Sequence, residues 1–356
     1  MADQVLTAAQ SAVRLDVADA GMVLVAQQHA RQVARQAGLD EDGAENAALV
    51  AAELAGNAQR HGQAGQLLVQ PCIEGPAVDV VALDRGPGMT DWDRSFVDGY
   101  STAAGSLGAG LGAVTRVASR VAGCAESERG TVVSARIGPV AHAATVGAVG
   151  SPRRGERVNG DAWSWAVDRA GVFAVLADGL GHGREAAAAG AAAVADPAGL
   201  ASSEPAEALL RIHTRLRGTR GAAVTVVRLR RSSGGSGFEL LVAGAGNVAA
   251  VVVAPDGSVR RTLIGHGTAG LVVRTPTQTT TAVPEDGVVV LHTDGVSGSW
   301  DLRGRPRAVA AAPVVLAALL LRDHERGSDD TGVLVLRPAP PDGEKAGRLA
   351  LGTAGP

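Results

Sequence analysis

The spacing of apolar residues predicts two helices near the start of the chain. Between residues 21 and 62, apolar side chains recur at the three- and four-residue spacing of one helix face, and Gly38 interrupts the pattern. Asp40 suits the N-cap of the second helix, and Gly62 suits its end. Strands are predicted at 67–69 and 77–83, and a glycine-rich segment then leads to a helix at 113–121 and a strand at 131–137. These elements predict one compact α/β unit.

A second pattern, of short β-branched runs, begins after a stretch without a clear period at residues 138–157. Strands are predicted at 172–177, 223–229, 238–243, 248–253, 288–292 and 333–336, with helices at 185–195, 204–217 and 313–324. From Pro338 onward, Pro, Gly and charged residues predict a disordered tail. We therefore expect domains at residues 1–140 and 155–338, a linker at 141–154 and a disordered tail at 339–356.

Composition agrees with two globular domains that have cores of small residues. The chain has 356 residues, of which 46% are hydrophobic, only 2% are aromatic and 48 are glycine. This hydrophobic content suffices for real cores, and the length fits two domains. Collagen is excluded because glycine has no triplet period, and the periodic Val, Leu and Ala segments argue against disorder.

Charge and cysteine content limit the binding partners and the cellular compartment that we expect. The 33 basic and 36 acidic residues give a formal net charge of −3, so no broad attraction to nucleic acid or an anionic membrane is expected. Cys72 and Cys124 lack ligand-type spacing and fit buried thiols in a reducing cytosol. The N-terminus shows no signal peptide, and the longest apolar run, at 308–321, is interrupted by Pro313 and is too short to span a membrane. We expect a cytoplasmic protein without nucleic-acid or membrane partners.

Three polar or glycine-rich motifs lie in the first half. In ELAGNAQRHG, Glu53, Asn57 and His61 are four residues apart and share one face of a helix. His61 is more simply explained as a helix-end residue that bonds backbone carbonyls. The motif DRGPG places Asp84 at the exit of an apolar strand, before two glycines that let backbone pass close to a ligand.

The third motif, GSLGAGLGAV, precedes a helix, and its free amides could wrap phosphates at the helix N-terminus. Each motif alone is common in ordinary turns. Their order and spacing together, over residues 15–138, resemble the GHKL ATPases, in particular the anti-sigma serine kinases typified by RsbT and RsbW.

This resemblance implies specific roles. Asn57 would hold Mg²⁺ that bridges the ATP phosphates, Glu53 would activate the hydroxyl of a protein serine, and Asp84 would read adenine. Phosphoryl transfer needs chiefly a metal, positioned oxygens and a base, which this set supplies. The remaining nucleotide contacts would come from Gly86 and Gly88 beside the base, Gly108, Gly110 and Gly112 over the phosphates, and Thr131 near the nucleotide.

Acidic residues in the second half recur at the ends of apolar or small-residue segments. They are Asp161 in NGDAW, Asp178 in ADGLGHG, Asp294 in TDGV, and Asp329 and Asp330 in SDDTG. A single Asp-Gly is more often a turn, but four such sites favour a two-metal centre of oxygen ligands. Mg²⁺ or Mn²⁺ ions in such a centre lower the pKa of a bridging water and make it a nucleophile.

These motifs, with GAGNV between them, resemble the SpoIIE branch of the metal-dependent serine/threonine protein phosphatases over residues 155–337. The resemblance implies two packed β-sheets flanked by helices, and direct attack of a bound hydroxide on phosphoserine or phosphothreonine without a phosphoenzyme. His182 stays open between a general acid and a loop residue. The implied metal ligands are Asp161 and Asp178, which are also the catalytic carboxylates, the carbonyl of Gly179, Asp294, and one of Asp329 and Asp330, with Asp329 favoured.

The expected fold class is α+β, with an N-terminal GHKL (Bergerat) α/β sandwich followed by a C-terminal α-β-β-α sandwich. We expect a bifunctional switch that uses ATP and Mg²⁺ in a serine kinase domain and two Mn²⁺ or Mg²⁺ ions in a phosphatase domain. Its expected substrates are STAS-type anti-sigma antagonist proteins, with a sigma factor as a further partner.

The same residues also fit other functions of the first half. It could be a non-catalytic, ATP-dependent sensor or a module that sequesters a sigma factor, because either function needs the same ATP pocket. A sensor histidine kinase is disfavoured because no dimerisation helix pair precedes the domain. A MutL- or gyrase-like ATPase is disfavoured because no transducer domain follows residue 137.

Overall fold

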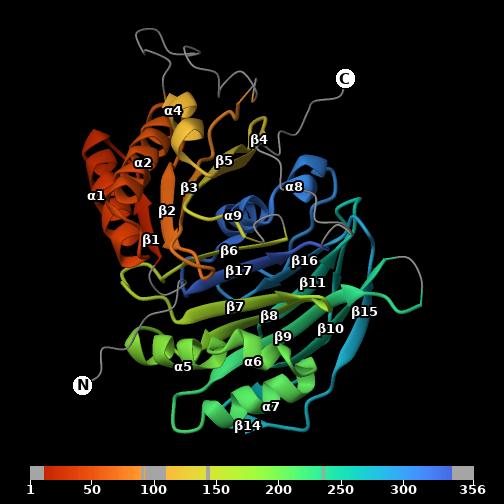
Figure 1. Ribbon diagram of the computed structural model, residues 1–356. Helices are drawn as coiled ribbons and strands as arrows, with labels where there is room; N and C mark the ends of the chain where they lie inside the picture. Colours follow the sequence, from red (N-terminus) through yellow and green to blue (C-terminus); the bar gives the residue numbers. More distant parts are fainter. Residues whose placement is uncertain (1–11, 90–91, 93–109, 142–144, 235–236, 339–356) are drawn as a thin grey trace.

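The computed structural model describes residues 12–89, 92, 110–141, 145–234 and 237–338 (Figure 1). No helix in these ranges is long and apolar enough to cross a membrane. The tail expected at 339–356 lies outside them.

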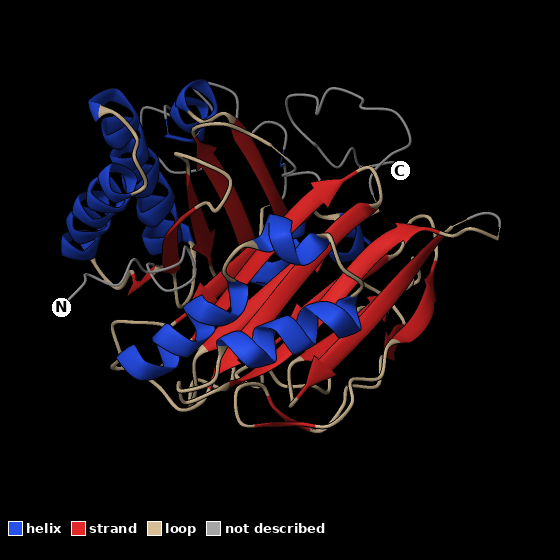
Figure 2. Cartoon of the chain, turned by 60° about the horizontal axis from the view of Figure 1, so that its bottom comes forward, coloured by secondary structure: helices blue, strands red, loops and turns tan. Residues whose placement is uncertain are grey.

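The first half is a five-stranded antiparallel sheet with helices on one face (Figures 1 and 2). The strand order is β1-β2-β3-β5-β4. Apolar residues of the helices and of alternate strand positions, such as Val33, Leu54, Leu67 and Val80, form the core between them. The elements are β1 (Val13–Asp16), α1 (Ala20–Gln36), α2 (Glu41–His61), β2 (Gln66–Pro71), β3 (Val78–Leu83), α4 (Gly110–Val117), β4 (Arg120–Glu126) and β5 (Gly130–Ile137).

Capping residues explain where the first two helices begin. The Asp40 side chain accepts a hydrogen bond from the backbone nitrogen of Gly43 at 2.9 Å, as predicted for the N-cap of α2. Asp19 caps α1 in the same way, through Met22. The helix predicted at 113–121 instead ends at Val117, because residues 120–126 pair with β5 as β4.

The second half is a four-layer α-β-β-α sandwich, which confirms the expected fold class (Figure 2). One sheet has the order β15-β10-β9-β8-β7 and the other β12-β11-β16-β17-β6, and the residues between them include Trp163, Leu240, Leu291 and Leu334. Helices α5 (Arg184–Val194), α6 (Pro197–Ala201) and α7 (Pro205–Arg215) cover the first sheet. The strands are β6 (Val146–Ser151), β7 (Asp161–Asp168), β8 (Gly171–Gly179), β9 (Ala222–Arg231), β10 (Phe238–Ala245), β11 (Ala249–Val253), β12 (Val259–Arg261), β15 (Thr279–Val283), β16 (Val288–His292) and β17 (Thr331–Leu336), with β13 (Gly267–Thr268) and β14 (Val272–Val273) in a small separate ribbon.

The segment expected to link the two halves contains a strand. β6 lies within residues 141–154 and pairs with β17 along its whole length, from Val146 opposite Leu336 to Ser151 opposite Thr331. The expected linker is therefore partly an edge strand of the second half, and the stretch without a clear period is ordered by its partner strand.

Helix α9 (Pro313–His324), which follows the short α8 (Pro306–Ala310), lies between the two halves (Figure 1). Its apolar residues pack on Val149 and Val333 of the second half and also on Leu68 and Val81 of the first. A helix that is apolar on all sides must be buried on all sides, and this one is covered by a sheet from each half. The two halves therefore share one apolar core.

Candidate functional site

Two aspartates lie side by side at adjoining strand ends in the second half. Asp161 begins β7 and is paired with Asp178 near the end of β8. Asp161 is fully buried. Its Oδ2 accepts a hydrogen bond from the Thr293 hydroxyl at 2.7 Å, whereas its buried Oδ1 has no hydrogen-bond partner. An unpaired buried carboxylate oxygen is costly and suits a site that takes a cation.

Neighbouring polar residues orient these carboxylates. Asn159 accepts a hydrogen bond from the Asp161 backbone nitrogen at 2.9 Å. Asp294 follows β16, and its Oδ2 accepts a hydrogen bond from Asn247 at 2.6 Å. Asn159 of NGDAW and Thr293 of TDGV thus both bond Asp161, whereas Asn247 of GAGNV bonds Asp294.

The adjacent residues Asp329 and Asp330 lie in different environments. Asp330 is buried, and its two oxygens accept hydrogen bonds from the backbone nitrogens of Arg153 at 2.8 Å and Gly160 at 2.9 Å. Asp329 is exposed and accepts one hydrogen bond, from the Asp330 nitrogen. Asp330 thereby fixes the turn that precedes Asp161.

Burial and like charge raise the pKa values of this group. Burial is the largest cause at Asp161, whose pKa lies well above its usual range, and the charge of Asp178 adds to it. Burial and then the charge of Asp294 raise the pKa of Asp178 to about 7. Burial also raises the pKa of Asp294 and Asp330. The fold thus holds several carboxylates where their charged forms are disfavoured.

The donor set fits a hard divalent cation. Carboxylate and carbonyl oxygens are the ligands that Mg²⁺ and Mn²⁺ prefer. The Oδ1 of Asp161, which has no hydrogen-bond partner, is an oxygen of this kind. In the described ranges, however, no group of three or more His, Cys, Asp or Glu side chains is already gathered to hold a metal.

Gly179 and His182 follow Asp178 in the same turn. A Cβ at Gly179 would come within 2.1 Å of the Ala186 carbonyl oxygen, so the residue packs directly on α5. The Nδ1 of His182 lies 2.8 Å from Glu156 Oε1, and both side chains are partly exposed. His182 thus lies in the loop before α5 and contacts Glu156.

The first-half motif on α2 has the predicted helical spacing. Glu53, Asn57 and His61 lie on successive turns, with Glu53 and Asn57 half-buried and His61 exposed at the last helical position. The Asn57 Oδ1 accepts a hydrogen bond from Arg60 at 3.0 Å.

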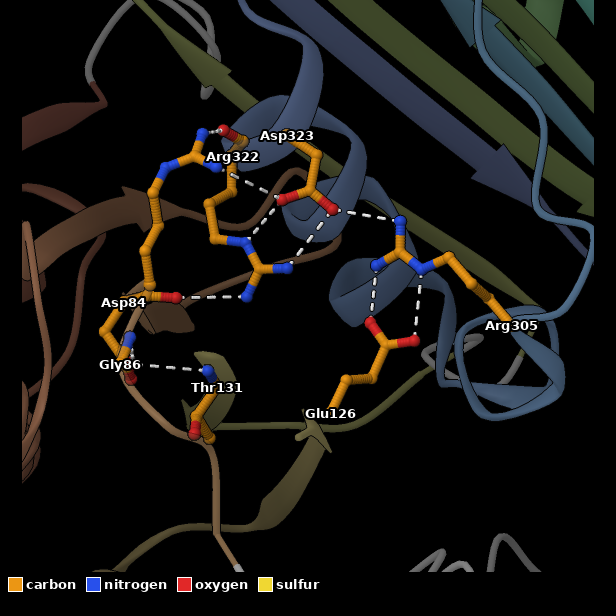
Figure 3. A network of polar contacts seen from close by, with 8 residues as sticks. Asp84, Gly86, Glu126, Thr131, Arg305, Arg322 and Asp323 are labelled. Carbon is orange, nitrogen blue, oxygen red and sulfur yellow. Dashed lines mark hydrogen bonds and ion pairs between the residues drawn. The ribbon is translucent and has the colours of Figure 1, made fainter. Parts of the chain in front are cut away.

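Asp84 lies directly after β3, beside the start of β5. Its Oδ1 accepts hydrogen bonds from the backbone nitrogens of Gly86 at 2.8 Å and Thr131 at 3.3 Å (Figure 3). Burial raises the pKa of Asp84, and these two donors oppose the shift. The structure therefore brings Asp84, Gly86 and the buried Thr131 together.

The glycines of the first half have packing reasons of their own. A Cβ at Gly86 would come within 2.8 Å of the His61 carbonyl oxygen, and Gly88 has φ +83°. Gly110 and Gly112 were expected ahead of a helix that begins at residue 113, but the helix begins at Gly110 and includes both glycines. Gly108 lies outside the described residues.

A charged network joins the Asp84 turn to α9 (Figure 3). The Arg322 guanidinium donates to the Asp84 carbonyl oxygen at 3.1 Å and to the Asp323 carboxylate at 2.7 Å. Arg305 lies 3.0 Å from Asp323 and also pairs with Glu126 of β4. Sequence reasoning missed this network, although an Arg-Asp pair at the end of an apolar run was a visible signal.

Two family models match the chain. The histidine kinase-like ATPase domain model (HATPase_c_2) matches residues 17–137, and the stage II sporulation protein E (SpoIIE) model matches residues 168–338. Both resemblances expected from the motifs are thereby confirmed. The first match contains Glu53, Asn57 and Asp84; the second contains Asp178 but begins after Asp161. No curated protein matches the chain.

Solved structures are similar to about half of the chain. One from work on the bacterial stressosome has 27% identity and a TM-score of 0.47, covering 54% of this chain and 98% of its own. RsbX in complex with magnesium has 19% identity and a TM-score of 0.46, covering 54% and 94%. The RsbU and RsbW domains of a Mycobacterium tuberculosis protein have 20% identity and a TM-score of 0.43, covering 54% and 59%.

Proposed function

We propose that this chain, in which a histidine kinase-like ATPase domain precedes a SpoIIE domain, is a metal-dependent protein serine/threonine phosphatase with a nucleotide-binding regulatory half. One observation carries the proposal: Asp161 and Asp178 face each other across paired strands, and the buried Oδ1 of Asp161 has no partner. Such a pair is stabilised by a divalent cation.

The residues of the second half would have two roles: one group would bind the metal ions, and the other would orient the ligands. Asp161, Asp178, Asp294 and Asp329, with the carbonyl of Gly179, would hold two Mn²⁺ or Mg²⁺ ions. Bound there, the ions supply charge neutralisation for a phosphoryl group and a lowered pKa for water. The second group, which orients the ligands, consists of Thr293 on Asp161, Asn247 on Asp294, and Asp330 on the turn at Gly160.

The proposed substrates are phosphoserine or phosphothreonine residues of STAS-type anti-sigma antagonist proteins, and the proposed setting is a partner-switching signalling system. The order of the motifs in both halves supports this assignment, since kinase-type and phosphatase-type units on one chain can set the phosphorylation state of one partner.

The phosphatase assignment is tested by Mn²⁺-dependent release of phosphate from p-nitrophenyl phosphate. We expect the Asp178→Asn, Asp294→Asn double variant to be inactive because it removes two carboxylate ligands. Asp168→Asn is the matched control, since this residue at the far end of β7 faces Arg228 at 3.6 Å with a half-exposed side chain. Full activity in the double variant would sink the assignment.

For the first half, the proposed activity is ATP-dependent transfer to a serine of the same partner. Asn57 would hold Mg²⁺ on the phosphates, Glu53 would accept the serine proton, and Asp84 would bind the adenine amino group. Its Oδ1 is occupied by two backbone donors, and no contact within the described ranges engages Oδ2, which leaves this oxygen for a ligand.

Kinase activity is tested with labelled ATP and an unphosphorylated STAS partner. Transfer of the γ-phosphate should vanish in Glu53→Ala, because the base is lost. Glu45→Ala is the control on the same helix, since Glu45 forms an exposed pair with Arg31. Transfer that persists in Glu53→Ala would remove Glu53 as the base.

A second candidate function for the first half is a nucleotide sensor that transfers no phosphate. It is favoured by the hydrogen bond from Arg322 of the second half to the Asp84 carbonyl. Nucleotide binding without transfer to any tested partner would support this candidate.

A further inference from the structure

The last turn of α9 is bonded from both halves of the chain. The carbonyl groups at the end of a helix lack partners within the helix and need donors from elsewhere. Arg85, next to Asp84 in the first half, donates to the Arg322 carbonyl oxygen. In the second half, Ser297 donates its backbone N–H to the His324 carbonyl at 2.8 Å. The last turn of α9 thus accepts one hydrogen bond from each half of the chain.

On the first-half side, the contact reaches the candidate nucleotide residue itself. Arg322 donates to the Asp84 carbonyl oxygen, while the Asp84 carboxylate is held by Gly86 and Thr131 (Figure 3). The side chain of Arg322 is only 3% exposed. A buried guanidinium is held in place by its few acceptors, so a shift of the Asp84 turn must be met by a shift of Arg322 or by a broken bond.

On the second-half side, the same turn reaches the Asp294 loop. Arg326 donates its backbone N–H to the Gly295 carbonyl at 2.8 Å, and Val296 is bridged to Glu325. A Cβ at Gly295 would lie 2.1 Å from the Asp330 carbonyl oxygen, so the backbone of this loop packs directly against the Asp329–Asp330 turn.

We propose that Arg322 is a positioning residue for both sites, and that the last turn of α9 couples nucleotide occupancy at Asp84 to the geometry of the Asp294 and Asp329 loops. This inference rests on the proposed nucleotide site and deepens it by naming how that site regulates the phosphatase half. Because coupling between two ligands is reciprocal, a nucleotide that alters Mn²⁺ affinity must have its own affinity altered by Mn²⁺ by the same factor.

Hydrogen exchange on the full chain tests the coupling without an activity measurement. The probe is the non-hydrolysable ATP analogue AMP-PNP with Mg²⁺, and its binding is followed in parallel by calorimetry. We expect AMP-PNP to change the exchange rates of the Ser297 and Arg326 amides by about fivefold or more, the lower end of typical coupling. Amides in the middle of β9 should not respond.

Variants separate coupling from a merely structural role. Arg322→Met should abolish the response at Ser297 and Arg326, whereas Arg322→Lys, which keeps a donor, should restore part of it. Arg303→Met is the control because it removes an exposed pair with Asp301 nearby. If Arg322→Met does not fold, Arg85→Met removes the first-half donor from a side chain that is 53% exposed.

The outcomes distinguish this inference from the proposed function. AMP-PNP binding that leaves the Ser297 and Arg326 amides unchanged would overturn the coupling and leave the nucleotide site standing. An unchanged response in foldable Arg322→Met would likewise overturn the role of Arg322. Failure of AMP-PNP to bind the wild-type chain would overturn both the coupling and the nucleotide site.

Discussion

Asp161 and Asp178 are held where their charged forms are least stable. Burial is the largest cause of the raised pKa at both residues, and neighbouring aspartates add to it. Carboxylates in this position gain stability either from a proton or from a cation. Their response to pH in the absence of metal is therefore a direct property of the site.

We predict that the metal-free protein loses stability as the pH rises. The pKa of Asp178 is about 7 in the folded chain, above the usual value of its unfolded form, so the folded state binds more protons between these values. The free energy of unfolding should therefore fall as the pH rises toward about 7 and then level off for this group.

Thermal unfolding in a chelator, from about pH 5 to about pH 8, measures this slope. Asp178→Asn should flatten it, because the asparagine does not titrate, while Asp168→Asn should keep it. An identical slope in wild type and Asp178→Asn would show that Asp178 is not perturbed.

The sequence singled out aspartates that the structure brings close together, but it did not indicate what orients them. Asp161, Asp178 and Asp294 each stand in a recognisable short motif. The hydrogen bond from Thr293 to Asp161 joins residues 132 positions apart, and such a contact follows from strand pairing that no local pattern encodes. The Arg322 network was missed for the same reason.

At the scale of elements, the sequence pattern predicted the position of α9 but not its packing partners. Its bounds were predicted correctly as residues 313–324. An apolar run without a polar face predicts burial on all sides, but it does not say which elements provide the cover. β6 was missed because its sequence VGAVGS has two glycines, which disfavour a strand until β17 pairs with it.

We predict that Gly147→Ala disturbs the packing of α9 on β6. A Cβ at Gly147 would lie 2.2 Å from the Val314 backbone nitrogen, so either the helix or the strand must move. The expected loss is roughly 1–3 kcal/mol in the free energy of unfolding, as for other overpacked cores.

Denaturant unfolding measures this loss, with Gly298→Ala as the control. A Cβ at Gly298 meets nothing within 4 Å, so its variant should stay within about 0.5 kcal/mol of wild type. Equal stabilities of the two variants would contradict the close packing of α9 on β6.

At the scale of the whole molecule, the two halves form one body around α9. Leu68 and Val81 of the first half share a core with Val149 and Val333 of the second. Partly buried ion pairs, Arg14 with Glu325 and Arg305 with Glu126, cross the same boundary. Because large apolar interfaces suppress independent domain motion, the two halves are expected to move together.

The central claim is that the carboxylates of the second half hold the divalent metal of a phosphatase. Calorimetric titration of Mn²⁺ into the full chain, above the pKa of Asp178, tests it most directly. The account predicts binding to wild type and to Asp168→Asn, and a loss of about tenfold or more in affinity for Asp178→Asn. Mn²⁺ that fails to bind the wild-type chain, or that binds Asp178→Asn as tightly as wild type, would contradict it.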